Sequence, residues 1–315
     1  MEQEVVKVPF FETLIFEHAA IAVWGILLAI FTIVDVFFGK MMLMLSIEFS
    51  ITLQKASLFV PSFIFSHVIM YLIIAYFLVV FFLRRHKVAN AGHFAAIFVL
   101  MYLSNLLKLI YADPRPSFLS TELKSLIYYC EKDYGKPSGH AMLSAGIFMF
   151  IYDDLACNNF KSWPRYIVLV LCFVGIVLMC FSRLYFGVHS FNQVILGFLW
   201  GVFVFFVLNG NYEWLAQYVY RPALSQAVSP RAKTGFRVVV PCVTLILIGL
   251  MLLFWGINIG SETDSGSIFG PAVSCLDAAS SLTSGFSTKI ASDGFVGLFL
   301  PGFLYGLHYS PFKAA

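Results

Sequence analysis

The sequence predicts an all-α fold, a polytopic membrane helix bundle, and two observations carry that prediction. Hydrophobic residues make up 60% of the 315 residues and charged residues only 12%, whereas a soluble domain is roughly half apolar and a quarter charged. The apolar residues also gather in long runs that can cross a bilayer. The small net charge of +3 gives no indication of nucleic-acid binding.

The N-terminal part contains one apolar run and one mixed segment. Residues 19–38 are apolar and long enough for a first membrane span. Residues 40–58 contain Lys40, Glu48 and Lys55 among methionines and leucines. This second segment is too mixed to span, so we expect an interfacial amphipathic helix or a loop packed on the membrane surface.

Further apolar runs follow, separated by polar segments. They predict spans at 60–83, 92–111, 138–155, 166–181, 191–208 and 236–256. Apolar segments resume at 268–276 and 294–308, where we expect a re-entrant or short helix and then a final helix. With the span at 236–256, about two C-terminal helices therefore follow the first six. The chain then divides into an N-terminal part (1–59), a core (60–208) and a C-terminal part (209–315).

The string Lys136-Pro137-Ser138-Gly139-His140 lies where a polar loop becomes an apolar run. Proline suits the first turn of a helix, serine can cap that helix, and glycine allows a ligand to approach the backbone closely. The free N–H groups and the dipole of a helix N-terminus favour an anion. The string therefore predicts a phosphate site with His140 in its first turn.

Two further strings place cations at helix ends. Lys108 stands seven residues before Arg115, so the two would share one helix face, and the prolines beside Arg115 end that helix. Residues 182–193 lie between two apolar runs and contain Arg183 and His189. Charged groups near membrane depth are costly and usually functional. We therefore predict that these groups form one site.

Basic residues predict the orientation of the bundle. They gather in the segments 84–90, 156–165 and 209–237, which share one face if the spans alternate. The positive-inside rule makes that face cytosolic. The three strings then lie together on the opposite, lumenal or extracellular face.

Together the three strings resemble the signature of the type 2 phosphatidic acid phosphatase superfamily. That signature is Lys-x6-Arg-Pro, then Pro-Ser-Gly-His, then Ser-Arg-x5-His-x3-Asp. All three parts occur in order and with their internal spacing, between about residues 60 and 208. The surroundings of the second and third strings are similar to sphingosine-1-phosphate phosphatases. One position departs, because the final Asp is Gln193, as in glucose-6-phosphatases and dolichyl-diphosphate phosphatases.

The resemblance implies a phosphoric monoester hydrolase, related to acid phosphatases and vanadium haloperoxidases, with a six-helix phosphatase core. It implies that His189 is the nucleophile that forms a phosphohistidine, and that His140 is the general acid and then the base. The groups that bind the substrate phosphate would be Lys108, Arg115, Ser138, Gly139 and Arg183. No cluster of residues has metal-ligand spacing, so we expect neither a metal nor another cofactor.

Gln193 follows His189 by about one helical turn, so the two side chains would face each other. A carboxylate at this position would hold the second imidazole nitrogen and stabilise the imidazolium, whereas glutamine offers a neutral oxygen. We count Gln193 among the catalytic residues. Two outcomes stay open: aspartate at 193 would be tolerated if the residue only orients the imidazole, and harmful if the pocket is built around a neutral group.

The leading function is a metal-independent membrane phosphatase that hydrolyses a lipid phosphomonoester, either a sphingoid-base phosphate or phosphatidate. The alternatives are a glucose-6-phosphatase-like sugar phosphatase, a polyprenyl-diphosphate phosphatase, and an inactive protein that binds lipid phosphates. An apolar opening between helices would favour a lipid, and a closed polar cup would favour a sugar. We expect an endoplasmic reticulum protein with a lumenal site, whose partners are this substrate and membrane lipids, not nucleic acid.

Overall fold

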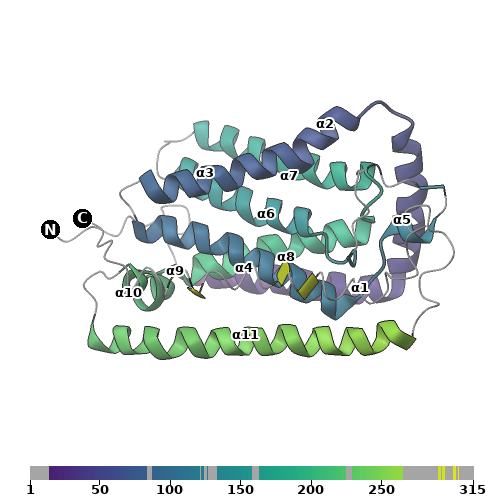
Figure 1. Cartoon of the computed structure of the whole chain (residues 1–315). Coiled ribbons are helices and arrows are strands. Elements are labelled where there is room, and N and C mark those ends of the chain that lie inside the picture. Colours follow the sequence, from purple (N-terminus) through teal and green to yellow (C-terminus); the bar gives the residue numbers. More distant parts are fainter. Residues whose placement is uncertain are drawn as a thin grey trace.

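The computed structural model describes residues 14–83, 87–120, 122–123, 126, 133–157, 163–224, 229–264, 290–291, 293–294, 301–302 and 304. Regular structure in this part of the chain is helical, which confirms the predicted all-α bundle (Figure 1). The longer helices are α1 (Leu14–Gln54), α3 (Ile69–Leu83), α4 (Lys87–Tyr111), α6 (Gly139–Tyr152), α7 (Trp163–Tyr185), α8 (Phe191–Gly210) and α11 (Pro230–Asp264). The shorter ones are α2 (Phe59–Phe63), α5 (Pro116–Leu119), α9 (Tyr212–Leu215), α10 (Arg221–Ala223) and the π-helical turns η2 (Ile64–Val68), η3 (Asp153–Cys157) and η4 (Ala216–Tyr220).

Several of these helices cross a membrane. Within the described residues, 6 helical segments are long and apolar enough to span, namely His18–Gln54, Phe59–Val79, Asn90–Leu119, Trp163–Tyr185, Phe191–Gly210 and Pro230–Ile259. The chain is therefore an integral membrane protein. Helix α6 continues into η3 and packs against α4, α7 and α8, so it lies inside the bundle. A helix enclosed in this way need not match the thickness of the bilayer.

Helix α1 is longer than the sequence predicts. It contains 41 residues, about 60 Å at ~1.5 Å per residue, or roughly twice the hydrocarbon thickness of a bilayer. The expected end near residue 38 is wrong, because the charges that follow lower the hydropathy without breaking the helix. Figure 1 shows the later part of α1 turning across the end of the bundle near α5. There Ser46 Oγ accepts from the backbone N–H of Phe191 at 2.7 Å, and Gln54 Nε2 donates to the carbonyl of Tyr185 at 3.2 Å.

Helices α6 and α8 approach each other closely because glycines line their contact. A Cβ added at Gly197 would lie 2.5 Å from the carbonyl oxygen of Ser138, and one added at Gly201 would lie 2.3 Å from that of Met142. Small residues four apart allow this backbone contact between membrane helices. The contact continues to the helix ends, where the Ser138 N–H donates to the Gln193 carbonyl at 2.9 Å. The second and third sequence strings are thus joined through their backbones.

The C-terminal part lies along α4. The segment 209–235, expected to be a linker, contains α9, η4 and α10, and α11 already begins at Pro230. The Tyr102 hydroxyl donates to the Leu247 carbonyl and Asn258 Nδ2 donates to the Leu109 carbonyl, both at 2.7 Å. The apolar segment 268–276 lies outside the described residues, and most of 294–308 does too, so the last C-terminal helix stays a prediction.

Candidate active site

The three sequence strings meet at one end of the bundle (Figure 1). Each of their functional candidates lies at or near a helix end, and most are buried. The candidates are Lys108 in the last turn of α4, Arg115 before α5, Ser138 and Gly139 at the start of α6, His140 in its first turn, Arg183 in the last turn of α7, and His189 and Gln193 at the start of α8. Segments far apart in the sequence therefore supply one site.

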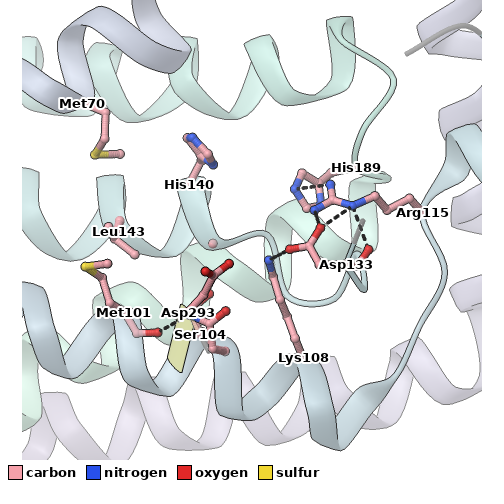
Figure 2. Close-up of a pocket in the computed structure, with 12 residues that line it drawn as sticks. Met70, Met101, Ser104, Lys108, Arg115, Asp133, His140, Leu143, His189 and Asp293 are labelled. Atoms are coloured by element: carbon pink, nitrogen blue, oxygen red, sulfur yellow. Dashed lines mark hydrogen bonds and ion pairs between the residues drawn. The ribbon is translucent and has the colours of Figure 1, made fainter. Parts of the chain in front are cut away.

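A cavity of about 320 Å³ opens between these helix ends, lined by Met70, Met101, Ser104, Asn105, Lys108, Arg115, Asp133, Gly139, His140, Leu143, His189 and Asp293. Figure 2 shows Lys108, Arg115 and Asp133 beside His189 at one end of it. Met70, Met101 and Leu143 lie toward the other end, with His140, Ser104 and Asp293 between. Ser138, Arg183 and Gln193 are not among the lining residues.

The imidazole of His189 is held at both nitrogens. Nδ1 lies 2.8 Å from the carbonyl oxygen of Gly135 and 3.4 Å from Oε1 of Gln193. Both partners can only accept, so Nδ1 carries the proton. Nε2 then carries the lone pair, and it faces the guanidinium of Arg115 at 3.2 Å. Nε2, the nitrogen with the lone pair, therefore lies beside the cations.

Gly135 was missed by sequence reasoning, which assigned the orienting contact to Gln193 alone. The carbonyl of Gly135 is the nearer of the two acceptors. No motif marks a backbone carbonyl, because it depends on how the loop folds rather than on a side chain. The nearest sequence signal is the glycine itself, three residues before Ser138.

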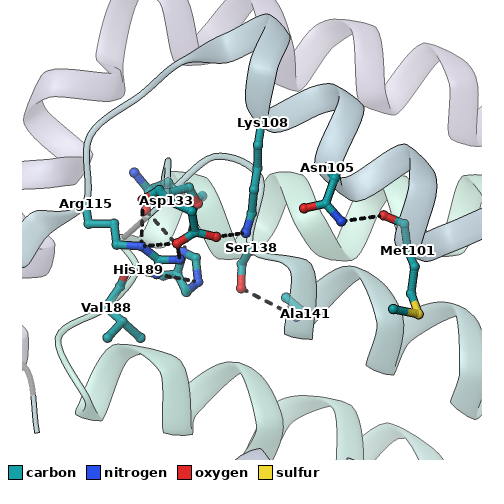
Figure 3. Close-up of polar contacts among 11 residues, drawn as sticks. Met101, Asn105, Lys108, Arg115, Asp133, Ser138, Ala141, Val188 and His189 are labelled. Carbon is teal, nitrogen blue, oxygen red and sulfur yellow. Dashed lines mark hydrogen bonds and ion pairs between the residues drawn. The ribbon is translucent and has the colours of Figure 1, made fainter. Parts of the chain in front are cut away.

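Arg115 and Lys108 are fixed by a shared carboxylate, Asp133. Arg115 Nε donates to both the carbonyl oxygen and Oδ1 of Asp133 at 3.0 Å, and its Nη2 also contacts Oδ1. Arg115 Nη1 donates to the Val188 carbonyl at 2.9 Å, and Lys108 Nζ pairs with the other carboxylate oxygen of Asp133 (Figure 3). Buried cations need such a partner. No role in the site was assigned to Asp133 from the sequence.

The start of α6 is built as the sequence predicts. The Ser138 hydroxyl accepts from the backbone N–H of Ala141, which confirms the predicted N-cap. A Cβ on Gly139 would lie 2.9 Å from Ser104 Oγ, so only glycine leaves this space open between α6 and α4. The ring of His140 is half-buried and lies 6.2 Å from the ring of His67, measured between centroids. The ring of His67 also stacks on Phe63.

Arg183 approaches the site from a different side. It is fully buried, and its Nη1 donates to Ser66 Oγ at 2.7 Å. Ser66 and His67 both belong to η2. Extra turns of this π-helical kind often occur at functional sites. The sequence offered no motif for this segment, because a π turn depends on packing.

Gln193 bridges two of the sequence strings. Its Oε1 accepts from the N–H of Ser190 at 3.2 Å and forms a capping box at the start of α8. Its Nε2 donates to Asp113 Oδ2 at 3.1 Å and to the Pro114 carbonyl at 2.8 Å. The side chain therefore ties the segment before Arg115 to the helix that follows His189.

A carboxylate of α1 also reaches this region. Asp35 is buried, forms an ion pair with Lys136, and accepts from Asn192 Nδ2 at 2.8 Å. The ammonium group of Lys136 also lies 5.2 Å from the ring centre of Tyr111. Sequence reasoning found no partner for Asp35. Both partners are neighbours of site residues, so α1 is joined to the site as well as to the bundle.

The described residues contain no group of three or more His, Cys, Asp or Glu side chains placed to hold a metal ion. The fold and the site together define a polytopic membrane protein with a buried histidine and two carboxylate-linked cations in one cavity. Residues 90–217 match the family model of the PAP2 superfamily. This match over residues 90–217 confirms the resemblance stated from the motifs.

Curated relatives are phosphatases of several kinds. The chain is 28% identical over 108 residues to a dihydrosphingosine 1-phosphate phosphatase of Saccharomyces cerevisiae, which covers 34% of this chain and 27% of the relative. It is 36% identical over 90 residues to glucose-6-phosphatase catalytic subunit 1 of Mus musculus, covering 26% and 25%. It is 30% identical over 153 residues to dolichyldiphosphatase of Saccharomyces cerevisiae, covering 44% and 59%.

The chain thus spans about a quarter of the length of the first two relatives, 27% and 25%. No solved structure gave a significant match.

Proposed function

We propose that this chain is an integral membrane phosphatase that hydrolyses a lipid phosphomonoester through a phosphohistidine on His189. One observation carries the proposal. A single cavity joins a cationic end, with Lys108, Arg115 and His189, to an apolar end with Met101 and Leu143. A phosphate attached to an apolar chain has the same two parts.

The reaction proceeds in two displacements. His189 Nε2 attacks phosphorus and forms a P–N bond while the bond to the leaving oxygen breaks, and His140 gives that oxygen a proton. A water molecule then gives a proton to His140 and attacks phosphorus, the P–N bond breaks, and inorganic phosphate leaves. The protonated Nδ1 stays hydrogen-bonded to the Gly135 carbonyl, which stabilises the positive ring of the intermediate.

The cations and the start of α6 bind the phosphoryl oxygens. Lys108 and Arg115 supply positive charge beside Nε2 of His189, where negative charge develops in the transition state. The N–H groups of Gly139 and His140, in a helix capped by Ser138, add the donors of a helix N-terminus. Arg183 is proposed as a third cation, which acts from the side of η2.

The apolar end favours a lipid over a sugar. An acyl or sphingoid chain would bury apolar surface against Met70, Met101 and Leu143. Sphingoid-base phosphate or phosphatidate is the first substrate class. A polyprenyl diphosphate is the second, because the similarity to dolichyldiphosphatase extends over 44% of the chain.

We propose that the site faces the lumen of the endoplasmic reticulum. Arg165, Arg221 and Arg231 lie in or beside α7, α10 and α11, at the end of the bundle opposite the site. Basic residues next to membrane spans favour the cytosolic side. The site end would then be lumenal.

The test is phosphate release by the purified protein in detergent. The substrates are sphingosine-1-phosphate, long-chain and short-chain phosphatidate, a polyprenyl diphosphate and glucose 6-phosphate, each with and without vanadate. Long-chain lipid phosphates should be hydrolysed fastest, and vanadate should block release. His189→Ala should lower kcat by at least about a thousand-fold because it removes the nucleophile.

His18→Ala is the control, since His18 is exposed on α1. Wild-type turnover by His189→Ala would exclude the phosphohistidine. Binding of the lipids with no phosphate release would support the inactive lipid-phosphate binding protein instead.

A further inference from the structure

The amide of Gln193 has one orientation that satisfies all of its neighbours. On one side lies a donor, the N–H of Ser190, at 3.2 Å. On the other side lie two acceptors, the Asp113 carboxylate at 3.1 Å and the Pro114 carbonyl at 2.8 Å. Turning the amide over would set its oxygen against both acceptors. The NH₂ group therefore belongs on the side of Asp113, and Oε1 faces Ser190 and His189.

Asp113 controls both acceptors of the His189 Nδ1 proton. Its backbone carbonyl accepts from the N–H of Gly135 at 2.8 Å, and the carbonyl of Gly135 accepts from His189. Its carboxylate accepts from the amide of Gln193, whose Oε1 is the second acceptor. Asp113, two positions before Arg115, thus fixes two separate contacts to the same ring nitrogen.

Gly135 and Gln193 are also fitted to each other. A Cβ at Gly135 would lie 2.5 Å from Oε1 and 2.6 Å from Nε2 of Gln193. The amide therefore lies directly against the glycine, where no side chain could fit. This contact keeps the two acceptors of Nδ1 next to each other.

We propose that Asp113 is a positioning residue for His189, and that it requires the neutral amide of Gln193. A carboxylate at 193 could not donate to Asp113 or to the Pro114 carbonyl, and it would place two acidic groups in contact. The common signature has Asp at the position of Gln193. In this chain the glutamine there is matched by an acidic residue in the first string, Asp113. This inference rests on the proposed function, because it takes His189 as the nucleophile.

The experiment is a double-mutant cycle. Gln193→Glu keeps the size of the side chain and the oxygen that caps α8, but it replaces the donor with a second carboxylate oxygen and adds a negative charge. Asp113→Asn keeps an acceptor, and in the double variant its NH₂ group can donate to the new carboxylate at position 193. Gln217→Glu, at an exposed position of η4, is the matched control.

The expected result is a loss that the second substitution repairs. Gln193→Glu should lower kcat by about ten-fold, the cost of one or two orienting hydrogen bonds, with KM changed by less than about two-fold. Asp113→Asn/Gln193→Glu should recover to within about three-fold of wild type. The fall in kcat with KM intact distinguishes a positioning role from a general structural defect. A wild-type kcat in Gln193→Glu, or a double variant no better than Gln193→Glu, would overturn the proposal.

Thermal unfolding of the same proteins in detergent separates this inference from the proposed function. Gln193→Glu should lower the unfolding midpoint and the double variant should restore it, whether or not the protein hydrolyses any substrate. If the wild type releases no phosphate, the proposed function fails, and the restored midpoint still supports the pairing of Asp113 with Gln193. If His189→Ala is inactive but Gln193→Glu keeps the wild-type rate and midpoint, only this inference fails.

Discussion

The two ends of the cavity are held in different ways. At the cationic end, His189 and Arg115 bond to backbone carbonyls of Gly135 and Val188, and Asp133 links Arg115 to Lys108. Directional bonds to a fixed backbone leave these groups little freedom. At the apolar end, Met70, Met101 and Leu143 come from three helices and meet the cavity through flexible hydrocarbon side chains.

This difference predicts which kinetic constant, kcat or KM, depends on each end of the cavity. The cationic end fixes atoms around phosphorus, so substitutions there should mainly change kcat. The apolar end offers a shape that can adapt, so substitutions there should change KM, and only for substrates long enough to reach it.

Among the substitutions that test this contrast between the two ends, the largest effect is expected for Arg115→Lys. Lysine keeps the charge but cannot donate at once to the carbonyls of Asp133 and Val188 and to Nε2 of His189. We expect kcat/KM to fall by about a hundred-fold on every substrate, which corresponds to roughly 3 kcal/mol of transition-state stabilisation. Arg231→Lys, exposed at the start of α11, should match the wild type.

A loss of less than about three-fold in Arg115→Lys would show that charge alone suffices at this end. The contrast between a fixed and an adaptable end would then not hold.

Most of the fold could be predicted from the sequence, because hydropathy acts locally along each helix. The spans at 92–111, 166–181 and 191–208 lie within α4, α7 and α8. The first span was placed correctly but ended too early, since Lys40 ends an apolar run without ending a helix.

The candidate site could be predicted only as far as the motifs reach. The strings identified Lys108, Arg115 and His189, which the structure brings into one cavity. Asp133 and Gly135 lie in a loop without periodicity, so their contacts become visible only in three dimensions. Asp35 is still harder to foresee, because it stands 157 positions before its partner Asn192.

A smaller and more selective effect is expected at the apolar end. Leu143→Ala removes apolar surface from the cavity, and each buried methylene contributes about 0.8 kcal/mol. We expect KM to rise by about five-fold for a long-chain lipid phosphate and to stay unchanged for its short-chain analogue. Because both substrates are measured on the same variant, any loss of stability cancels in the ratio.

Leu245→Ala, at an exposed position of α11, is the matched control for this end. An equal rise in KM for both chain lengths would mean that Leu143 does not contact the substrate chain. The apolar end would then be part of the packed bundle rather than a binding surface for a lipid.

The smallest change in rate is expected for Asp35→Asn. This substitution tests whether the contacts that fix the cationic end of the cavity extend to α1. Asp35 belongs to α1, outside the matched residues 90–217, yet it contacts Lys136 and Asn192. Lys136 stands four residues before His140, and Asn192 stands three after His189. Asparagine keeps an acceptor for Asn192 but removes the negative charge beside the Lys136 ammonium. Unfolding should therefore occur at a clearly lower temperature, because a mostly buried cation loses its partner.

The rate should fall less than the stability, because the contacts of Asp35 are with Lys136 and Asn192 and not with Lys108, Arg115 or the imidazole of His189. We expect kcat to drop by about three-fold as the starts of α6 and α8 lose part of their mutual alignment. Glu48→Gln, exposed on the same helix, should change neither quantity. If Asp35→Asn keeps the wild-type rate and unfolding midpoint, α1 serves only as an anchor, and the site is complete without it. If both fall, the rigid part of the site includes α1, because a carboxylate on that helix holds the segments that carry the two histidines in register.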